Sequence, residues 1–172
     1  MSSKILDDKF FSRPTLKVAE KLLGKFLVRK ISRRKIADMI TEVEVYTGPE
    51  DKASHASRGR TERNKIMFGK AGYWYVYFTY GMHWMLNIVT EKEGYPAAIL
   101  IRGVGGVKGP GRLTNFFKID KGFNNKLADR KTGLWIEDRG IKIKPRQIKR
   151  GKRIGVGYAG RWENKLWRFF LI

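Results

Sequence analysis

The chain has 172 residues, of which 37 are Lys or Arg and 16 are Asp or Glu, so its formal net charge is +21. That length suits one domain, residues 1–172, with a proper hydrophobic core, and the charge favours a polyanionic partner. The lack of cysteine excludes disulfide bonds and thiolate metal sites. No apolar run could span a bilayer, and the first residues lack the features of a signal peptide. We therefore expect an intracellular protein with no membrane partner.

The N-terminal part begins with a leader into the fold, residues 1–13. A helix is predicted over Pro14–Leu23, because proline suits a first helical turn and Gly24 can end the helix. Two strands then follow, joined by a basic turn at Ser32–Lys35. They are predicted at Phe26–Ile31 and Ile36–Tyr46.

The second of these strands carries polar and apolar residues in alternation. Val43 and Val45 point to one side, and Glu42, Glu44 and Tyr46 point to the other, because side chains alternate along a strand. Two carboxylates and a tyrosine on one face are typical of the solvated side of a sheet. The strand taken alone therefore favours a surface position for Glu44.

A long segment without regular structure, Thr47–Lys70, comes next. It contains four glycine and proline residues together with His55 and several arginines, and Asn64–Phe68 could form a helical turn. A loop of this length inside a compact domain is usually functional or disordered. Its histidine is either a site residue or a hydrogen-bonded loop residue.

The stretch from Tyr73 to Val89 predicts a β-hairpin. Tyr73–Tyr80 is rich in aromatic and β-branched residues, Gly81 supplies a bend, and Trp84–Val89 returns as a second apolar strand. Tyr80 and Met82 then lie at the tip, where they cannot pack into the hairpin itself. In so basic a chain, stacked nucleic-acid bases are the obvious partner for an exposed aromatic ring.

The remaining chain predicts short strands separated by glycine-rich breaks, and a helix after Gly109 with Leu113, Phe116 and Phe117 on one side. The strands are expected at Ala97–Arg102, Leu134–Glu137, Ile141–Lys144, Arg153–Tyr158 and Leu166–Ile172. The fold class is α+β: a single domain with a mostly antiparallel β-sheet, packed helices and a protruding β-hairpin.

The residue types alone leave more than one function open. An acidic cluster in a cationic chain suggests a reaction centre, although surface turns explain acidic residues more often; its members are Asp38, Glu42, Glu44, Glu50 and Asp51. These acids could bind the metal ions of a metal-dependent nuclease, but they give that function only weak support. A nucleic-acid-binding module would need only the charge and the aromatics. With two histidines, of which His83 is read as a surface or DNA-facing residue, a zinc site is improbable.

Several motifs together resemble the alkyladenine (3-methyladenine) DNA glycosylase family. The first is TEVEVYTGPEDKASHASRGRTERNKIMFGKAGYWYVYFTYGMHWMLNIV, residues 41–89. The resemblance continues through AAILIR (97–102), KGPGRLT (108–114) and RIGVGYAGRW (153–162), so that it covers most of the chain. Motifs of this length are specific. The resemblance implies an enzyme that removes damaged purines from double-stranded DNA, as a monomer and without a cofactor or metal.

The resemblance also implies catalytic and DNA-inserting residues. Glu44 matches the carboxylate that activates water, and Arg102 matches a basic residue beside that water. Tyr80 matches the residue that enters the minor groove and fills the gap left by the extruded base, with Met82 as its neighbour at the hairpin tip. No lysine stands at a matched catalytic position, so we expect base removal without strand cleavage.

The expected base pocket follows from the same matches. Tyr46, His55 and Tyr77 match aromatic residues that enclose the extruded base, although Tyr77 could equally be a core residue. Asn87 matches a residue whose bulk disfavours guanine through its exocyclic amine. The implied substrates are 3-methyladenine, 7-methylguanine, hypoxanthine and ethenoadenine, and the implied compartment is the cytoplasm or nucleoid of a bacterium or a eukaryotic nucleus.

Overall fold

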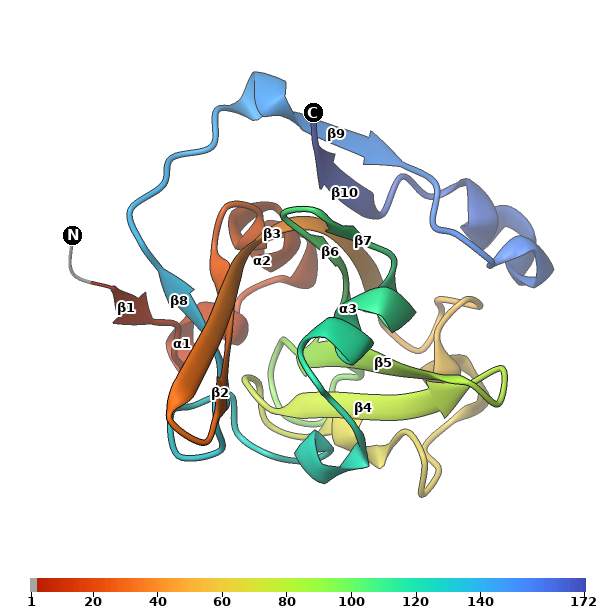
Figure 1. The fold of residues 1–172 in the computed structure, drawn as a ribbon. Helices are drawn as coiled ribbons and strands as arrows, with labels where there is room; N and C mark the ends of the chain where they lie inside the picture. The colour runs from red at the N-terminus through yellow and green to blue at the C-terminus, as the bar shows by residue number, and fades with distance from the viewer. Residues whose placement is uncertain (1–2) are drawn as a thin grey trace.

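A computed structural model describes residues 3–172. Ten strands form a sheet with the order β1-β8-β2-β3-β6-β5-β4, and every strand pair is antiparallel; β7 pairs with β6, and β10 pairs with both β3 and β9 (Figure 1). The strands are β1 (Lys4–Ile5), β2 (Phe26–Ile31), β3 (Arg34–Thr47), β4 (Trp74–Thr79), β5 (His83–Val89), β6 (Ala97–Val104), β7 (Val107–Lys108), β8 (Leu134–Asp138), β9 (Ile148–Gly151) and β10 (Arg168–Leu171). The predicted α+β class is confirmed.

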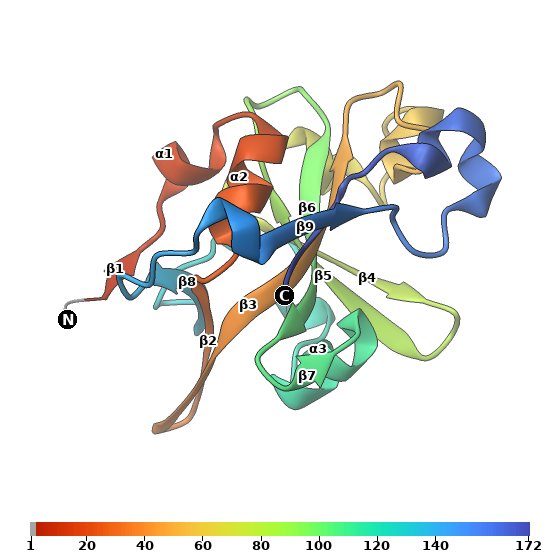
Figure 2. The ribbon, with the colours of Figure 1, turned by 90° about the horizontal axis from the view of Figure 1, so that it is seen from above.

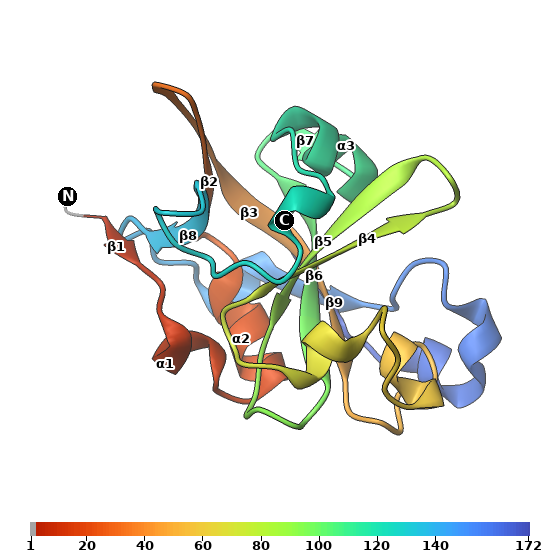
Figure 3. The same ribbon diagram turned by 90° about the horizontal axis from the view of Figure 1, so that it is seen from below.

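The helices cover different sides of this sheet. They are α1 (Asp8–Phe11), α2 (Thr15–Leu22) and α3 (Pro110–Phe116), with short 3-10 helices at His55–Arg58, Lys65–Phe68, Lys121–Phe123, Pro145–Gln147 and Gly157–Asn164. Figure 2 places α1 and α2 on one side of β3 and α3 on the other. The view from below in Figure 3 agrees. None of the helices in residues 3–172 has the length and apolar character needed to cross a membrane.

The longest strand, β3, joins the two halves of the sheet. Its first half pairs with β2 and its second half pairs with β6 on one edge and β10 on the other. Val43 and Val45, as predicted, are buried in the core. Glu44 lies between them with Leu100 of β6 and Arg168 of β10 as its neighbours in register, so this carboxylate is placed in the centre of the sheet and not at its edge.

The predicted hairpin is formed by β4 and β5, which pair from Trp74 with Ile88 to Thr79 with His83. The backbone N–H of Met82 donates to the carbonyl of Thr79 across the turn, at 3.2 Å. His83 differs from its predicted surface position, because its ring is half-buried against α3. The ring lies so close to Gly111 that a Cβ atom on residue 111 would clash with it. The hairpin is therefore fixed to β6 near its base, through Asn87–Val89, and to α3 near its turn, through His83 and Trp84.

The first residues contribute more than a leader. Lys4 and Ile5 pair with β8, and α1 buries Phe11 in the main core. The sequence concealed this because a two-residue strand and a four-residue helix are too short to show a period. Residues 3–13 are thus part of the domain, whereas residues 1–2, also assigned to the leader, lie outside the described range.

We expect Phe11→Ala to lower the free energy of unfolding by about 3–5 kcal/mol, because a fully buried ring is replaced by a cavity. Phe11 is 1 % exposed. Lys9→Ala, on the same helix but exposed, is the matched control and should change stability little. Urea unfolding followed by circular dichroism measures both. If the urea midpoint of Phe11→Ala equals that of the wild type, residues 3–13 contribute no stability and are only a leader.

Other predicted elements need correction. Ile141–Lys144 forms no strand, since no neighbouring strand pairs with it; the side chains of Ile141 and Ile143 lie against Gly24 instead. Arg153–Tyr158 is not a strand either, because Gly155 has a φ of +75° and a 3-10 helix follows it. Phe116 is 45 % exposed, whereas Phe117 is buried, so these two rings do not share a face.

Candidate active site

Glu44 is fully buried, which overturns the solvated position that the strand alone favoured. Its Oε2 accepts a hydrogen bond from the Tyr46 hydroxyl at 2.8 Å, and its Oε1 accepts one from the backbone N–H of Ile154 at 2.7 Å. The Arg102 Nε lies 3.5 Å from the same Oε1. A carboxylate has about four acceptor positions, so these contacts leave capacity for a further donor such as water.

Arg102 reaches Glu44 because the pairing of β3 with β6 is irregular. The register shifts on both sides of Glu42, and Arg102 has no partner on β3, whereas its neighbours Ile101 and Gly103 do. Such bulges re-aim side chains. The Arg102 Nε donates to Glu42 at 3.1 Å, and Glu42 also accepts from Arg168 at 3.2 Å. The structure thus brings Glu44 and Arg102 together, as predicted, through a bulge that the sequence did not show.

The electrostatics of Glu44 are those of a buried acid. Burial raises the pKa of its carboxyl above the usual range, and the Arg102 charge, the Ile154 N–H and the Tyr46 hydroxyl oppose this rise. Burial and the Glu44 charge raise the pKa of Tyr46 far above its usual value, so this hydroxyl keeps its proton and donates a hydrogen bond to the carboxylate. Proton acceptors with raised pKa values are common in active sites.

A pocket of about 360 Å³ opens beside this carboxylate. Six predicted site residues line it: Tyr46, His55, Tyr77, Tyr80, Asn87 and Arg102. They come from β3, from the loop after it, from the β4–β5 hairpin and from β6. The pocket size suits a single purine base better than an intact nucleotide pair. Glu44 lies behind its wall, in contact with Tyr46.

The aromatic wall is built from His55 and the hairpin. The His55 ring meets the Tyr77 ring edge to face, with centroids 4.7 Å apart, and its Nδ1 is 3.0 Å from the Tyr75 hydroxyl. Burial, with the charges of Arg63 and Arg58, lowers the pKa of His55, so the ring is neutral at pH 7. Burial raises the pKa of Tyr75 to about 12 and that of Tyr77 even further. All three rings are therefore uncharged stacking surfaces.

Asn87 is buried on β5 with its side-chain amide held in one orientation. Its Nδ2 donates to the carbonyl of Tyr75 at 3.1 Å and lies 3.5 Å from that of Met85. These contacts fix where the amide stands against the pocket. They agree with the predicted location of Asn87, and its selective role stays a prediction.

The hairpin tip carries Tyr80 and Met82, which are 78 % and 64 % exposed. Tyr80 has a φ of +53° and Gly81 a φ of +65°. A tyrosine in this left-handed region is uncommon and costs of order 1–3 kcal/mol. Tyr80 lines the pocket, whereas Met82 does not. Their insertion into DNA stays a prediction.

Sequence reasoning missed four residues that complete the site. Tyr75, Ile154 and Tyr158 line the pocket, and Tyr158 also donates its hydroxyl to the carbonyl of Ala53 at 3.2 Å. Arg153 is buried behind Tyr46, with its guanidinium 4.9 Å from the ring centroid. Only the RIGVGYAGRW resemblance pointed to this part of the chain, because a buried arginine in a basic run looks like its exposed neighbours.

The predicted acidic cluster does not form one group: Glu42 and Glu44 share Arg102, whereas Asp38 and Asp51 have other partners. Asp51 forms a buried ion pair with Arg153, Asp38 accepts from the backbone of Met39, and Glu42 pairs with arginines. Within residues 3–172, no three His, Cys, Asp or Glu side chains gather as metal ligands would. The contacts of Glu44 itself are to Tyr46, Ile154 and Arg102, which are groups suited to orient a carboxylate.

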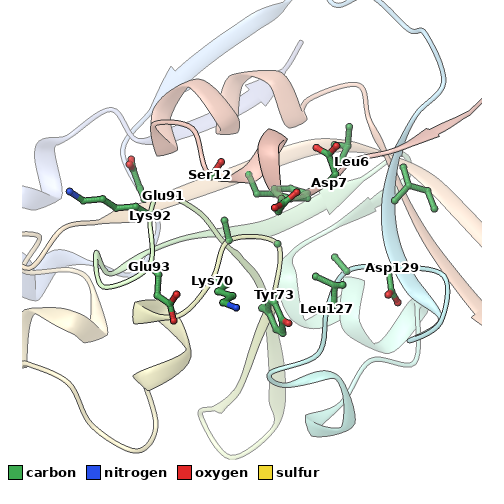
Figure 4. A pocket seen from close by; sticks show the side chains of 16 residues that line it. Leu6, Asp7, Ser12, Lys70, Tyr73, Glu91, Lys92, Glu93, Leu127 and Asp129 are labelled. Carbon is green, nitrogen blue, oxygen red and sulfur yellow. The ribbon is translucent and has the colours of Figure 1, made fainter.

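A larger pocket, of about 560 Å³, lies at the base of the same hairpin, at the opposite end from its turn (Figure 4). Phe11 and Leu127 contribute to its apolar lining, and acidic side chains such as Asp7 and Glu93 stand around it. It contains none of the predicted site residues. The chemistry expected from the sequence is therefore gathered in the smaller pocket beside Glu44.

Comparisons with known proteins agree with the resemblance. A family model described as methylpurine-DNA glycosylase (MPG) matches residues 9–108 and 105–172. A "Putative 3-methyladenine DNA glycosylase" of Methanocella arvoryzae is 41 % identical, over 96 % of this chain and 92 % of the relative. Proteins of the same name from Legionella pneumophila (strain Corby) and from Wolbachia pipientis of Culex pipiens are 41 % and 42 % identical, over 94 % and 98 % of this chain and 91 % of each relative. The chain belongs to the methylpurine-DNA glycosylase family.

Proposed function

We propose that this protein is a monofunctional DNA glycosylase of base excision repair, which removes alkylated or deaminated purines from double-stranded DNA as a monomer and leaves an abasic site. The observation that carries the proposal is the buried Glu44 carboxylate behind a base-sized pocket with aromatic walls. A carboxylate in this position has no packing role that an apolar side chain would not fill better.

Access of a base to this pocket requires it to leave the helical stack, because the pocket is lined by residues from several strands and loops and cannot enclose a paired base. Unstacking costs a few kcal/mol, and less for a damaged or mispaired base. Tyr80, exposed at the tip and adjoining the pocket, fills the vacated space. The net charge of +21 supplies phosphate contacts that do not depend on sequence.

The chemistry assigned to Glu44 is the hydrolysis of the N-glycosidic bond. A water oxygen attacks C1′, the bond to the purine breaks, the electron pair leaves with the base, and the water proton passes to Glu44. Positive charge develops on the sugar as the bond breaks, and the nearby carboxylate stabilises it. Arg102, 3.5 Å from Glu44, keeps the carboxylate ionised and oriented.

The proposed substrates fall into two classes. Cationic 3-methyladenine and 7-methylguanine have weakened glycosidic bonds and need little further activation. Hypoxanthine and ethenoadenine are neutral, so their removal depends on the fit between the base and the aromatic walls. Asn87, fixed by two backbone carbonyls, disfavours guanine by contact with its exocyclic amine.

The decisive experiment uses duplex oligonucleotides that carry one hypoxanthine or one ethenoadenine, with an undamaged adenine duplex of the same sequence as control. Strand breaks are counted with and without alkali, in the presence and absence of EDTA. We expect breaks in the damaged duplexes only after alkali, with or without EDTA. Breaks without alkali would indicate a lyase or nuclease, and no release from these or from methylated DNA would leave a DNA-binding protein without glycosylase activity.

The rate of base release should fall at acidic pH. Glu44 acts as the base only when ionised, and its pKa is raised above 4.5, so the rate is lost as the pH falls through this raised value. His55 has a lowered pKa, below 6.5, and stays neutral over the neutral range. Single-turnover rates between pH 4.5 and 9 on ethenoadenine DNA measure this. A rate that rises toward acidic pH would argue against Glu44 as base.

A further inference from the structure

A buried ion pair between Arg153 and Asp51 lies behind the pocket wall. The guanidinium donates to both carboxylate oxygens, at 2.6 and 2.9 Å, and both side chains are fully buried. It also donates to the carbonyl oxygens of Val45 at 2.9 Å and of Trp162 at 3.2 Å. The planar fork of arginine can hold several acceptors in fixed directions. One side chain therefore joins β3, the loop after β3 and the C-terminal segment.

Two of these connections meet at the catalytic carboxylate. Val45 follows Glu44 directly on β3, so the bond from Arg153 fixes the backbone beside the carboxylate. Arg153 directly precedes Ile154, whose N–H donates to Glu44 at 2.7 Å. Glu44 and Ile154 are 110 residues apart in sequence, and no regular strand pairing places Ile154, because the C-terminal segment leaves its strand at Gly151.

The third connection reaches the base pocket. Asp51 accepts from the backbone N–H of Ala53 at 3.1 Å and so shapes the turn that leads to His55. The guanidinium also lies over the ring of Tyr46, 4.9 Å from its centroid. Displacement of Arg153 would therefore move both the carboxylate's amide donor and a pocket wall.

We propose that the Arg153–Asp51 pair is a positioning element of the active site, which holds the N–H of Ile154 against the Glu44 carboxylate. This rests on the proposed function of Glu44 as the base. A fully buried ion pair gains little net stability, because desolvation of its charges offsets their attraction. Further titratable and charged groups also face Glu44: Glu42 and Tyr46 of β3, Tyr77 of β4, Arg102 of β6, and Arg168 of β10 through Glu42.

The first test removes the amide donor alone. Ile154 is half exposed and precedes Gly155, which has a positive φ, and proline is common at this position of a type II turn. Ile154→Pro loses the N–H. Circular dichroism and the Tm check that the fold is kept, and Ile154→Val, which keeps the N–H, is the reference for the change of the pocket-lining side chain. Relative to Ile154→Val, we expect the rate of base release on the acidic limb to fall about tenfold in Ile154→Pro, and the two variants should have similar rates at alkaline pH.

The second test breaks the pair. Asp51→Asn keeps the shape of the side chain, but it leaves the guanidinium charge uncompensated and could prevent folding. Arg153→Lys is the second variant, since it keeps the charge and loses the fork. Both are assayed below their measured Tm. We expect the same selective loss on the acidic limb as in Ile154→Pro, together with unchanged affinity for undamaged duplex DNA.

Three outcomes would overturn the proposal. The pH–rate profile of Ile154→Pro could match that of Ile154→Val, the profiles of the folded Asp51→Asn and Arg153→Lys variants could match that of the wild type, or the rate of base release could fall by the same factor at every pH. The titration of Glu44, followed by ¹³C carboxyl resonances, reads the same effect without activity. If the wild type releases no base, the proposed function fails. The positioning role is then still supported if Glu44 titrates at higher pH in Ile154→Pro and in the ion-pair variants than in the wild type. An undisplaced titration beside an active wild type defeats the positioning role alone.

Discussion

Glu44→Gln is expected to abolish alkali-labile product on damaged duplexes, with a rate at least about 10²–10⁴-fold below that of the wild type. Glutamine has nearly the same shape, and its carbonyl oxygen can accept the Ile154 hydrogen bond while its amide nitrogen faces the Tyr46 hydroxyl oxygen, but it cannot take a proton from water. The nearby Arg102 would lose one of its two carboxylate neighbours and keep Glu42. Single-turnover release from hypoxanthine DNA measures the effect, and fluorescence anisotropy measures DNA binding.

The matched control is Glu137→Gln. Glu137 is also a buried glutamate in a strand, but its partners are Trp135 and Arg139 in β8 and after it. It should lower stability without changing the rate of the folded enzyme. If Glu44→Gln kept wild-type release, Glu44 would not be the base, and if both variants lost DNA binding as well, a structural role would explain the result.

Tyr80→Ala is expected to reduce base release about 5- to 150-fold on duplex DNA, because stacking of a base on an aromatic side chain contributes about 1–3 kcal/mol. The loss arises before the chemical step, since the extruded state loses the ring that fills the vacated stack. Alanine keeps the Cβ atom and the positive φ of this position, and the exposed Tyr80 ring contributes little to the core, so the Tm should change little. Single-turnover rates on duplex substrates, with melting curves, measure both effects.

Tyr80→Phe keeps the ring and should retain most of the activity. A single-stranded substrate supplies a second control, because no duplex gap has to be filled and the difference between Tyr80→Ala and wild type should shrink. Equal rates of Tyr80→Ala and wild type on duplex DNA would show that the exposed ring at the tip has no part in base extrusion.

Elements whose formation depends mainly on their own residues were predicted correctly from the sequence. The hairpin was predictable because aromatic and β-branched residues flank a single glycine, and β2 matched its predicted bounds. Ile141–Lys144 has the same alternation as a strand, yet strand formation depends on a partner, which the sequence of the segment does not contain. The short β1 and α1 are stabilised by contacts with β8 and the core, and they were missed for the same reason.

The site was predictable in part, through a different route. The residue types and spacing around Glu44 pointed to the family, but the strand pattern alone pointed to the surface, since burial of Glu44 depends on β10 and the C-terminal segment covering β3. The bulge that aims Arg102 and the buried charge of Arg153 arise from tertiary pairing. No local feature distinguishes either arginine from the other 35 basic residues.

The contact between Glu44 and Ile154, 110 residues later, has a consequence for protein synthesis. A ribosome delivers the N-terminal part first, at about 5–20 residues per second, so β3 leaves the ribosome several seconds before the segment that completes its environment. Until then the carboxylate lacks its amide donor, and β3 lacks β10 along one edge. An unfinished or C-terminally degraded chain would retain much of the positive charge but would lack the surroundings of Glu44, so, if Glu44 is the base as we propose, we expect incomplete products to bind DNA without removing bases.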